Sequence, residues 1–266
     1  MGAPLPAPPG RAEPRAAGTA FGGAANGPVE WVLPEEAPVS LVYNGRPFGV
    51  MLASPSDLED FGLGFSLAER IIARPAEMES IEVTQGEQGF VLSMRILSER
   101  AALVAGRRRA LDARSGCGLC GIESLDAFHA ALPNVVAPDL APEAILRAFA
   151  DFRAHQPMRA RDRSVHGAAW CGRDGVFKLV REDVGRHSAL DKLIGAMARD
   201  GHDPRDGFAL LSSRCGFELV QKAAAVGIGF LACVSAPTSL ALDKARACGM
   251  GLACATRDGG LVRLTP

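Results

Sequence analysis

Residues 208–234 read FALLSSRCGFELVQKAAAVGIGFLACV, and their pattern predicts the fold class. Its first four residues form a short apolar run of strand length, and the last seven, from Ile228, form a second one. Between them, apolar residues of 217–226 recur at helical spacing, and Gly227 is the kind of residue that commonly ends a helix. A strand, a helix and a second strand in this order predict an α/β domain.

The same alternation extends through most of the C-terminal half, so we expect residues 123–266 to form this α/β domain. The motif Arg173-Asp174-Gly175 predicts a hairpin between strands at 165–171 and 176–181. Asp183 is expected to cap the next helix, at about 185–197, with Asp191 and Lys192 on its exposed side. A last helix begins at Thr238 or Ser239 and ends at Gly249, and a hairpin through 257–260 closes the chain.

The preceding part, residues 35–106, is predicted to form a smaller, strand-rich α+β subdomain. Asn44-Gly45 separates apolar runs at 39–43 and 48–52, which is a strong short-range hairpin signal. A capping box at 56–59 predicts a helix that continues to about Ile72, and strands are expected at 81–83 and 90–97. Residues 1–34 are dominated by Ala, Gly and Pro, a composition that predicts a disordered arm.

Composition excludes several classes of protein. A chain of 266 residues can bury a sizeable core, and its formal net charge of −1 argues against a nucleic-acid-binding surface. Seven cysteines without a framework of spacings suit a reducing compartment, so a cytoplasmic protein is expected. Glycines break the most apolar run, at 223–236, which is shorter than the ~18 residues of a membrane span. The N-terminal arm has no apolar core typical of a signal peptide.

Residues 107–122 form a basic, glycine-rich loop that carries Cys117 and Cys120. Flanking glycines predict exposed thiols, and nearby arginines at 107–109 and 114 favour the reactive thiolate. A Cys-x-x-Cys pair can also be half of a zinc site or a dithiol redox pair. A zinc site needs two more ligands, but the remaining cysteines are isolated. A dithiol redox pair would follow a strand, but no strand leads directly into Cys117 and Cys120. The arginines at 107–109 either contact phosphate or form a solvated helix face.

Seven segments together resemble the formate dehydrogenase accessory sulfurtransferase family, FdhD. They occur in the family's order over nearly all of the chain after residue 35. They are VYNG at 42–45, LGFSL at 63–67, GCGLCG at 116–121, REDVGRH at 181–187, DKLIG at 191–195, FELVQKA at 217–223 and VSAPTSL at 234–240.

The resemblance implies a cytoplasmic, homodimeric sulfurtransferase that works as a sulfur carrier. Such a protein accepts persulfide sulfur from a cysteine desulfurase and transfers it to the bis-molybdopterin guanine dinucleotide molybdenum cofactor, which formate dehydrogenase requires. The cofactor is bound as a substrate. The resemblance also implies a C-terminal domain similar to the cytidine deaminase fold. The catalytic residues of the family correspond to Cys117 and Cys120 of this chain. The family's cofactor-binding turn corresponds to Ala255, Thr256, Arg257, Asp258, Gly259 and Gly260.

Two alternatives to the sulfur carrier stay open, and the motifs of a third are missing. The first is a chaperone that holds the molybdenum cofactor without carrying sulfur, and the second is a structural zinc protein, although we expect no metal. The third, a zinc deaminase, requires His-x-Glu and a later Pro-Cys-x-x-Cys, and neither motif occurs.

His166, Arg186 and His187 either face a ligand or have structural roles. This chain departs from the family pattern at Gly167, Ser188 and 215–216.

Overall fold

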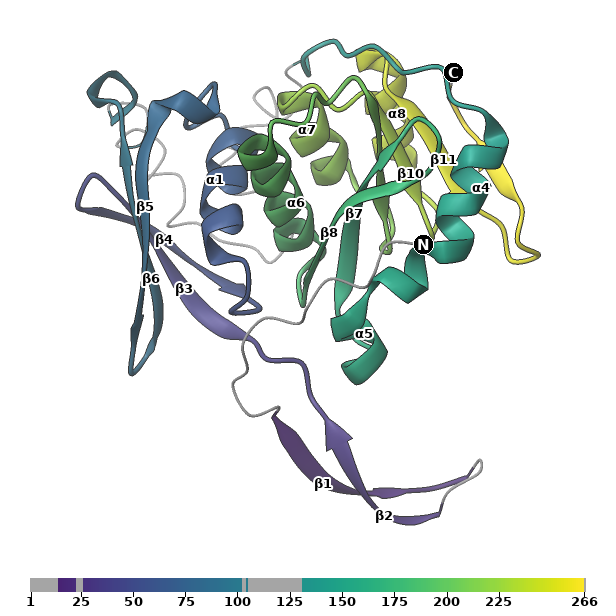
Figure 1. Cartoon of the computed structure of the whole chain (residues 1–266), viewed down its shortest axis with the longest axis horizontal. Coiled ribbons are helices and arrows are strands. Elements are labelled where there is room, and N and C mark those ends of the chain that lie inside the picture. Colours follow the sequence, from purple (N-terminus) through teal and green to yellow (C-terminus); the bar gives the residue numbers. More distant parts are fainter. Residues whose placement is uncertain (1–13, 23–25, 102–103, 105–130, 266) are drawn as a thin grey trace.

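The computed structural model describes residues 14–22, 26–101, 104 and 131–265, which form three sheets and the helices around them (Figure 1). The largest sheet has six strands in the order β12-β11-β10-β9-β7-β8. Its strands are β7 (His166–Gly172), β8 (Phe177–Asp183), β9 (Gly207–Leu211), β10 (Phe230–Cys233), β11 (Gly251–Ala255) and β12 (Leu261–Arg263). Residues 208–234 therefore supply β9, β10 and the helix between them, as predicted.

Strands β9, β10 and β11 are parallel, whereas β7 runs antiparallel to both of its neighbours and β12 runs antiparallel to β11. Both faces of β9 are buried, which is why its sequence is apolar throughout. Phe208 and Leu210 point to one apolar cluster, and Ala209 and Leu211 point to the other. The sheet is thus the middle layer of an α/β domain.

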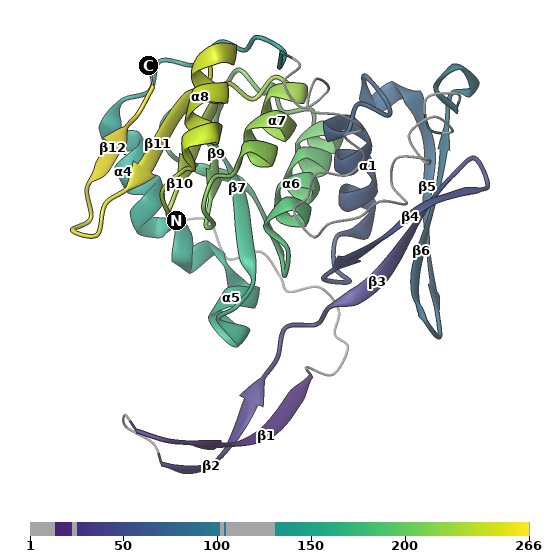
Figure 2. The ribbon, with the colours of Figure 1, turned by 180° about the vertical axis from the view of Figure 1, so that it is seen from behind.

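Helices cover the two faces of this sheet (Figures 1 and 2). On one side lie α6 (Arg186–Asp200), α7 (Phe217–Ala225) and α8 (Ser239–Cys248). On the other lie α4 (Pro142–Asp151), a 3-10 turn at Phe152–His155 and the short α5 (Pro157–Asp162). The predicted caps of α8 are confirmed, because Thr238 Oγ1 accepts a hydrogen bond from Ala241 N at 3.2 Å and Gly249 has a left-handed φ of 78°.

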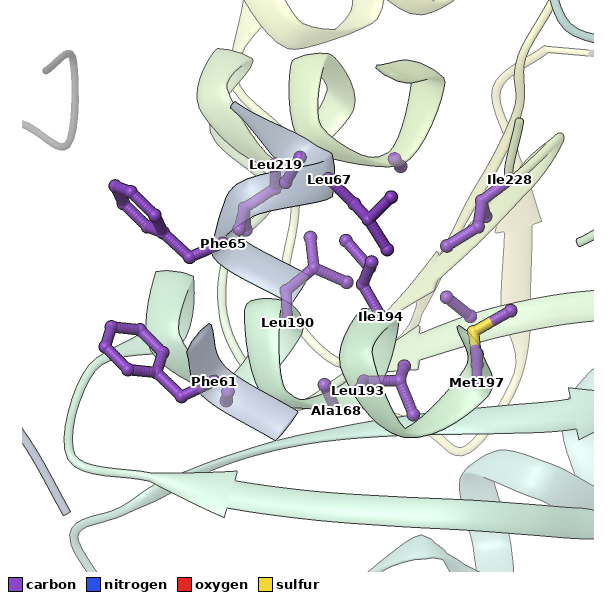
Figure 3. Close-up of a cluster of buried hydrophobic side chains, with 14 of the residues drawn as sticks. Phe61, Phe65, Leu67, Ala168, Leu190, Leu193, Ile194, Met197, Leu219 and Ile228 are labelled. Carbon is purple, nitrogen blue, oxygen red and sulfur yellow. The ribbon is translucent and has the colours of Figure 1, made fainter. Parts of the chain in front are cut away.

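The N-terminal part forms a four-stranded sheet in the order β4-β3-β6-β5. Its strands are β3 (Ala37–Tyr43), β4 (Arg46–Ala53), β5 (Met78–Gly86) and β6 (Gly89–Ile96). The predicted hairpin is confirmed, with φ of 47° at Asn44 and 77° at Gly45. Helix α1 (Leu58–Ala68) lies between this sheet and α6, so one apolar core continues through both parts (Figure 3).

Glycines set how closely α1 and α6 approach. A Cβ added to Gly64 would lie 1.7 Å from the Asp191 carbonyl oxygen, and one added to Gly195 would lie 1.9 Å from that of Asp60. Both separations are far shorter than any real contact, so the two backbones touch where only glycine fits. This crossing joins the N-terminal part to the α/β domain.

Two local expectations for α1 are wrong. The capping box is not formed, because Asp57 is the N-cap residue, with a left-handed φ of 50° and no capping hydrogen bond, and the Ser56 hydroxyl points to Met158 Sδ instead. The helix also ends at Ala68 rather than near Ile72. Ile71 and Ile72 are still buried, but they reach the core after a left-handed turn at Arg70, whose φ is 55°.

The prediction of a disordered arm is wrong for the part of it that the structure describes. Strands β1 (Arg15–Ala20) and β2 (Gly27–Val32) pair as an antiparallel ribbon that projects from the body (Figures 1 and 2). Trp31 anchors the ribbon, since the Arg163 guanidinium lies 5.7 Å from its ring centroid. Over the described residues, we find no helix whose length and apolarity would let it cross a membrane.

Candidate functional site at the carboxyl edge of the sheet

One edge of the six-stranded sheet gathers polar groups from segments far apart in the sequence. Strands β8 to β11 end there and the antiparallel β7 begins there, at His166. Helices α6, α7 and α8 all start at the same edge. Helix N-termini carry partial positive charge and free amide donors, so this edge is suited to binding an anion such as a phosphate.

The starts of α6 and α7 are joined by a cluster around Glu218. One oxygen of its carboxylate accepts hydrogen bonds from both Arg186 Nη2 and His187 Nε2, each at 2.8 Å. Burial alone would raise the pKa of Glu218, but these two bonds outweigh it and lower the pKa to about 2. A Cβ at Gly216 would lie 2.6 Å from this carboxylate, so a larger residue there would require the Glu218 side chain to shift. Arg186 and His187 therefore have a defined structural partner, and both remain partly exposed.

His166 lies beside this cluster, close enough for the charges of Arg186 and His187 to act on its imidazole. Its Nδ1 is buried and has no hydrogen-bond partner in the described part of the chain. Burial, followed by the nearby positive charge of Arg159 and Arg186, lowers the pKa of the imidazole, so it is neutral at pH ~7. The adjacent Gly167 N donates to Ser212 Oγ at 2.8 Å, which ties the start of β7 to the end of β9.

Asp183 is buried where the N-terminal part contacts the α/β domain. It is not the N-cap residue of α6, so that prediction is wrong. Gly185 is the N-cap residue, and its amide donates to Asp183 Oδ1 at 2.8 Å. Asp183 Oδ2 accepts from Ser54 N at 2.9 Å and pairs with Lys192 Nζ at 2.7 Å. Lys192 also donates to the Ser54 carbonyl at 2.9 Å. Two charged groups thus hold the end of β4 against the α/β domain.

The expectation that Asp191 and Lys192 lie on the exposed side of their helix is also wrong. Asp191 is 1% exposed and Lys192 is 0% exposed. Asp191 pairs with Lys222 of α7 at 2.9 Å, and Lys222 in turn pairs with Glu69 at the end of α1 at 2.9 Å. Burial alone would lower the pKa of Lys222, but the carboxylates of Asp191 and Glu69 outweigh it and raise the pKa, so the ammonium stays charged.

The predicted cofactor turn lies at the same edge, where β11 ends. Thr256 N donates to the Gly260 carbonyl at 2.8 Å, Thr256 Oγ1 contacts Asp258 Oδ1, and Gly259 has a φ of 86°. These contacts account for a plain hairpin into β12, while Arg257 is exposed. Three strand spacings of about 4.8 Å separate β11 from β7, so a ligand that touched both the turn and His166 would span roughly 14 Å.

The predicted catalytic pair, Cys117 and Cys120, lies outside the described residues, as do the arginines at 107–109 and 114. The other five cysteines are described and none is fully exposed. Burial raises the pKa of Cys171, Cys248 and Cys254. For Cys233, a hydrogen bond with Cys215 raises the pKa first and burial adds to the effect.

Within the described residues, no group of three or more His, Cys, Asp or Glu side chains is placed to hold a metal ion. Because Cys117 and Cys120 are not among them, the expected absence of metal stays a prediction. Two residues at the carboxyl edge, Glu218 and Arg214, were not among the residues predicted to form a site. The sequence predicts Glu218 only as part of a helix, but its place at the start of that helix, just after a strand-to-helix turn, is a usable signal. Arg214, in the same turn, is exposed.

Comparison with known proteins places this architecture in a family. The model of the FdhD/NarQ family matches residues 34–264. The sulfur carrier protein FdhD of Bordetella petrii is 50% identical over 215 residues, which cover 80% of this chain and 77% of that protein. The protein of the same name from Chromobacterium violaceum is 46% identical over 235 residues, 87% of each chain. The crystal structure of a putative formate dehydrogenase accessory protein from Desulfotalea psychrophila is similar, with a TM-score of 0.74, 20% identity, and coverage of 96% of this chain and 97% of that one. The chain therefore belongs to the FdhD/NarQ family.

Proposed function

We propose that this protein is a sulfurtransferase that carries sulfur as a persulfide on Cys117. The observation that carries the proposal is the state of the other cysteines. Sulfur transfer needs an accessible thiolate, and Cys171, Cys233, Cys248 and Cys254 have raised pKa values. Cys215 is 0% exposed. The glycine-flanked pair that includes Cys117 is therefore the best remaining candidate.

The first step of this chemistry balances without an added oxidant. The Cys117 thiolate attacks the terminal sulfur of the donor's persulfide, forming a new sulfur–sulfur bond. The donor's own sulfur–sulfur bond breaks, and the donor cysteine leaves as a thiolate. A family whose curated members are named sulfur carrier proteins supports this assignment.

The remaining parts of the proposal rest on the family relation. A cysteine desulfurase is the donor, the bis-molybdopterin guanine dinucleotide cofactor is the acceptor, and formate dehydrogenase receives the sulfurated cofactor. The protein acts in the cytoplasm as a homodimer, and its C-terminal domain is related to cytidine deaminases.

The carboxyl edge has the chemistry to receive such a cofactor. Three helices begin there, and two exposed arginines, Arg214 and Arg257, follow strands that end at the same edge. Arginine is well suited to phosphate because its planar guanidinium can donate two hydrogen bonds at once. Gly259 leaves the turn without a side chain, and nothing lies within 4 Å of the position its Cβ would take. An extended nucleotide with phosphates is the ligand class that this edge favours.

The test is peptide mass mapping after incubation of the full chain with a cysteine desulfurase and cysteine. We expect added sulfur on the Cys117 peptide, and we expect Cys117→Ala to abolish loading while the protein remains folded. Cys254→Ala is the matched control, because Cys254 is the most accessible of the five described cysteines. Sulfur confined to the other cysteines would refute the assignment. A Cys117→Ala protein that still supports formate dehydrogenase maturation would favour the cofactor-holding chaperone instead.

A further inference from the structure

We propose that a second site, remote from the carboxyl edge, binds a small organic anion with an apolar body. A cavity of about 820 Å³ lies where α1, α6 and α7 end. Helix α6 starts at the carboxyl edge and has 15 residues, so it separates the two sites by about 20 Å. The volume lies in the range of known small-molecule pockets. None of the residues described above at the carboxyl edge lines this cavity.

The floor of the cavity is apolar. Leu67 of α1 and Ile194 and Met197 of α6 line it, and all three belong to the buried core shown in Figure 3. Ala225 and Val226, at the end of α7, extend the same surface. These side chains offer no hydrogen bonds, so the part of a ligand that lies on them must be apolar.

The rim of the cavity is positively charged. Arg70, Arg100 and Arg205 line it, and Asp203 is the acidic side chain among the residues that surround it. Arg205 already pairs with Asp203 at 2.6 Å, and Arg100 pairs with the buried Glu77 at 2.8 Å. The exposed Arg70 side chain has no hydrogen-bond or ion-pair partner in the described part of the chain. An anionic group on the ligand would supply that partner.

The backbone at Arg70 gives an independent reason to assign its side chain a role. Arg70 N donates to the Leu67 carbonyl at 2.9 Å, and Ile71 N donates to the Ser66 carbonyl at 2.8 Å, which closes the end of α1. The turn requires a φ of 55° at Arg70, a conformation for which glycine is the usual residue. An arginine held there against its backbone preference is typical of a functional position.

A competing explanation is that Arg70 merely neutralises the negative ends of the three helices that stop at the cavity. The two explanations differ in what happens when Arg70 is replaced by glycine. Glycine fits the left-handed turn, so the anion site predicts an unchanged or higher melting temperature together with weaker anion binding. Neutralisation of the helix ends predicts a lower melting temperature.

The experiment is a fluorescence titration of the native full-length protein with anilinonaphthalene sulfonate, which joins an apolar body to an anion. The neutral analogue phenylnaphthylamine serves as the probe without charge. We expect Arg70→Gly and Arg70→Gln to weaken sulfonate binding by about tenfold or more, and to change binding of the neutral probe by less than about twofold. Arg74→Gln is the matched control, because Arg74 is exposed, close in sequence and not part of the cavity lining.

A further variant tests the location. Ala198→Trp places a large ring in the lining of the cavity and should abolish binding of both probes. Sulfur loading of Cys117, measured on the same variants, should be unchanged, so failure here and failure of the proposed function are separable. The proposal is overturned if wild-type protein binds the sulfonate no better than the neutral probe. It is equally overturned if the Arg70 variants bind both probes as the wild type does.

Discussion

Glu218→Gln is the most informative substitution at the carboxyl edge. It keeps the size of the side chain but removes the charge that Arg186 and His187 share. A carboxyl whose pKa falls from 4.5 to about 2 gains about 3 kcal/mol of stability in its charged form at neutral pH. Arg186 is 34% exposed, so solvent screening reduces this figure, and we expect a loss of about 1 to 2 kcal/mol.

The pH dependence has a definite sign. Because folding lowers the pKa of Glu218, its contribution is present in full above pH ~4.5 and is lost as the pH falls toward 2. The difference in unfolding free energy between wild type and Glu218→Gln should therefore fall to less than about half of its neutral value near pH 3. Urea denaturation at both pH values measures this difference. Glu59→Gln is the control, since Glu59 and its partner Arg199 are both about half exposed.

Two outcomes would contradict this reasoning. A stability difference that is the same at neutral and acidic pH would mean that the charge of Glu218 does not cause it. A Glu218→Gln protein as stable as the wild type at neutral pH would mean that the cluster is too well solvated to contribute.

Three further predictions concern the helix crossing, metal content and the carboxyl edge. Gly195→Ala places a carbon 1.9 Å from the Asp60 carbonyl oxygen and should lower stability by about 2 kcal/mol in thermal or urea unfolding, whereas Gly86→Ala, whose added carbon meets nothing closer than 3.8 Å, should be tolerated. Freshly purified reduced protein should contain much less than one zinc per chain by elemental analysis, and a chelator should leave its melting temperature unchanged; stoichiometric zinc lost in Cys117 and Cys120 variants would favour a structural metal site. A guanine nucleotide should bind at the carboxyl edge with the turn at its border, and Arg257→Ala should weaken binding about ten- to a hundredfold by calorimetry. Unchanged affinity in Arg257→Ala and in a folded Gly259→Val, Gly260→Val double variant would place the nucleotide elsewhere.

Local signals in the sequence determined most of the elements. The hairpin at Asn44-Gly45, the strand–helix–strand order of 208–234 and the caps of α8 all depend on residues close together in the chain, so backbone preference and apolar spacing suffice to predict them. The segments 181–187 and 217–223 could likewise be recognised as a family pattern without knowledge of their contacts.

The burial of the charged groups depends on contacts between elements that are far apart in the sequence. Lys222 is buried because Glu69, 153 residues away, and Asp191, 31 residues away, converge on it. Asp183 is buried against Ser54, 129 residues away. Helical spacing describes one helix at a time and cannot show which second helix covers a face, so a charged residue that pairs across such a contact looks exposed in the sequence. The left-handed end of α1, at Arg70, depends on packing for the same reason, because arginine has no local preference for a positive φ.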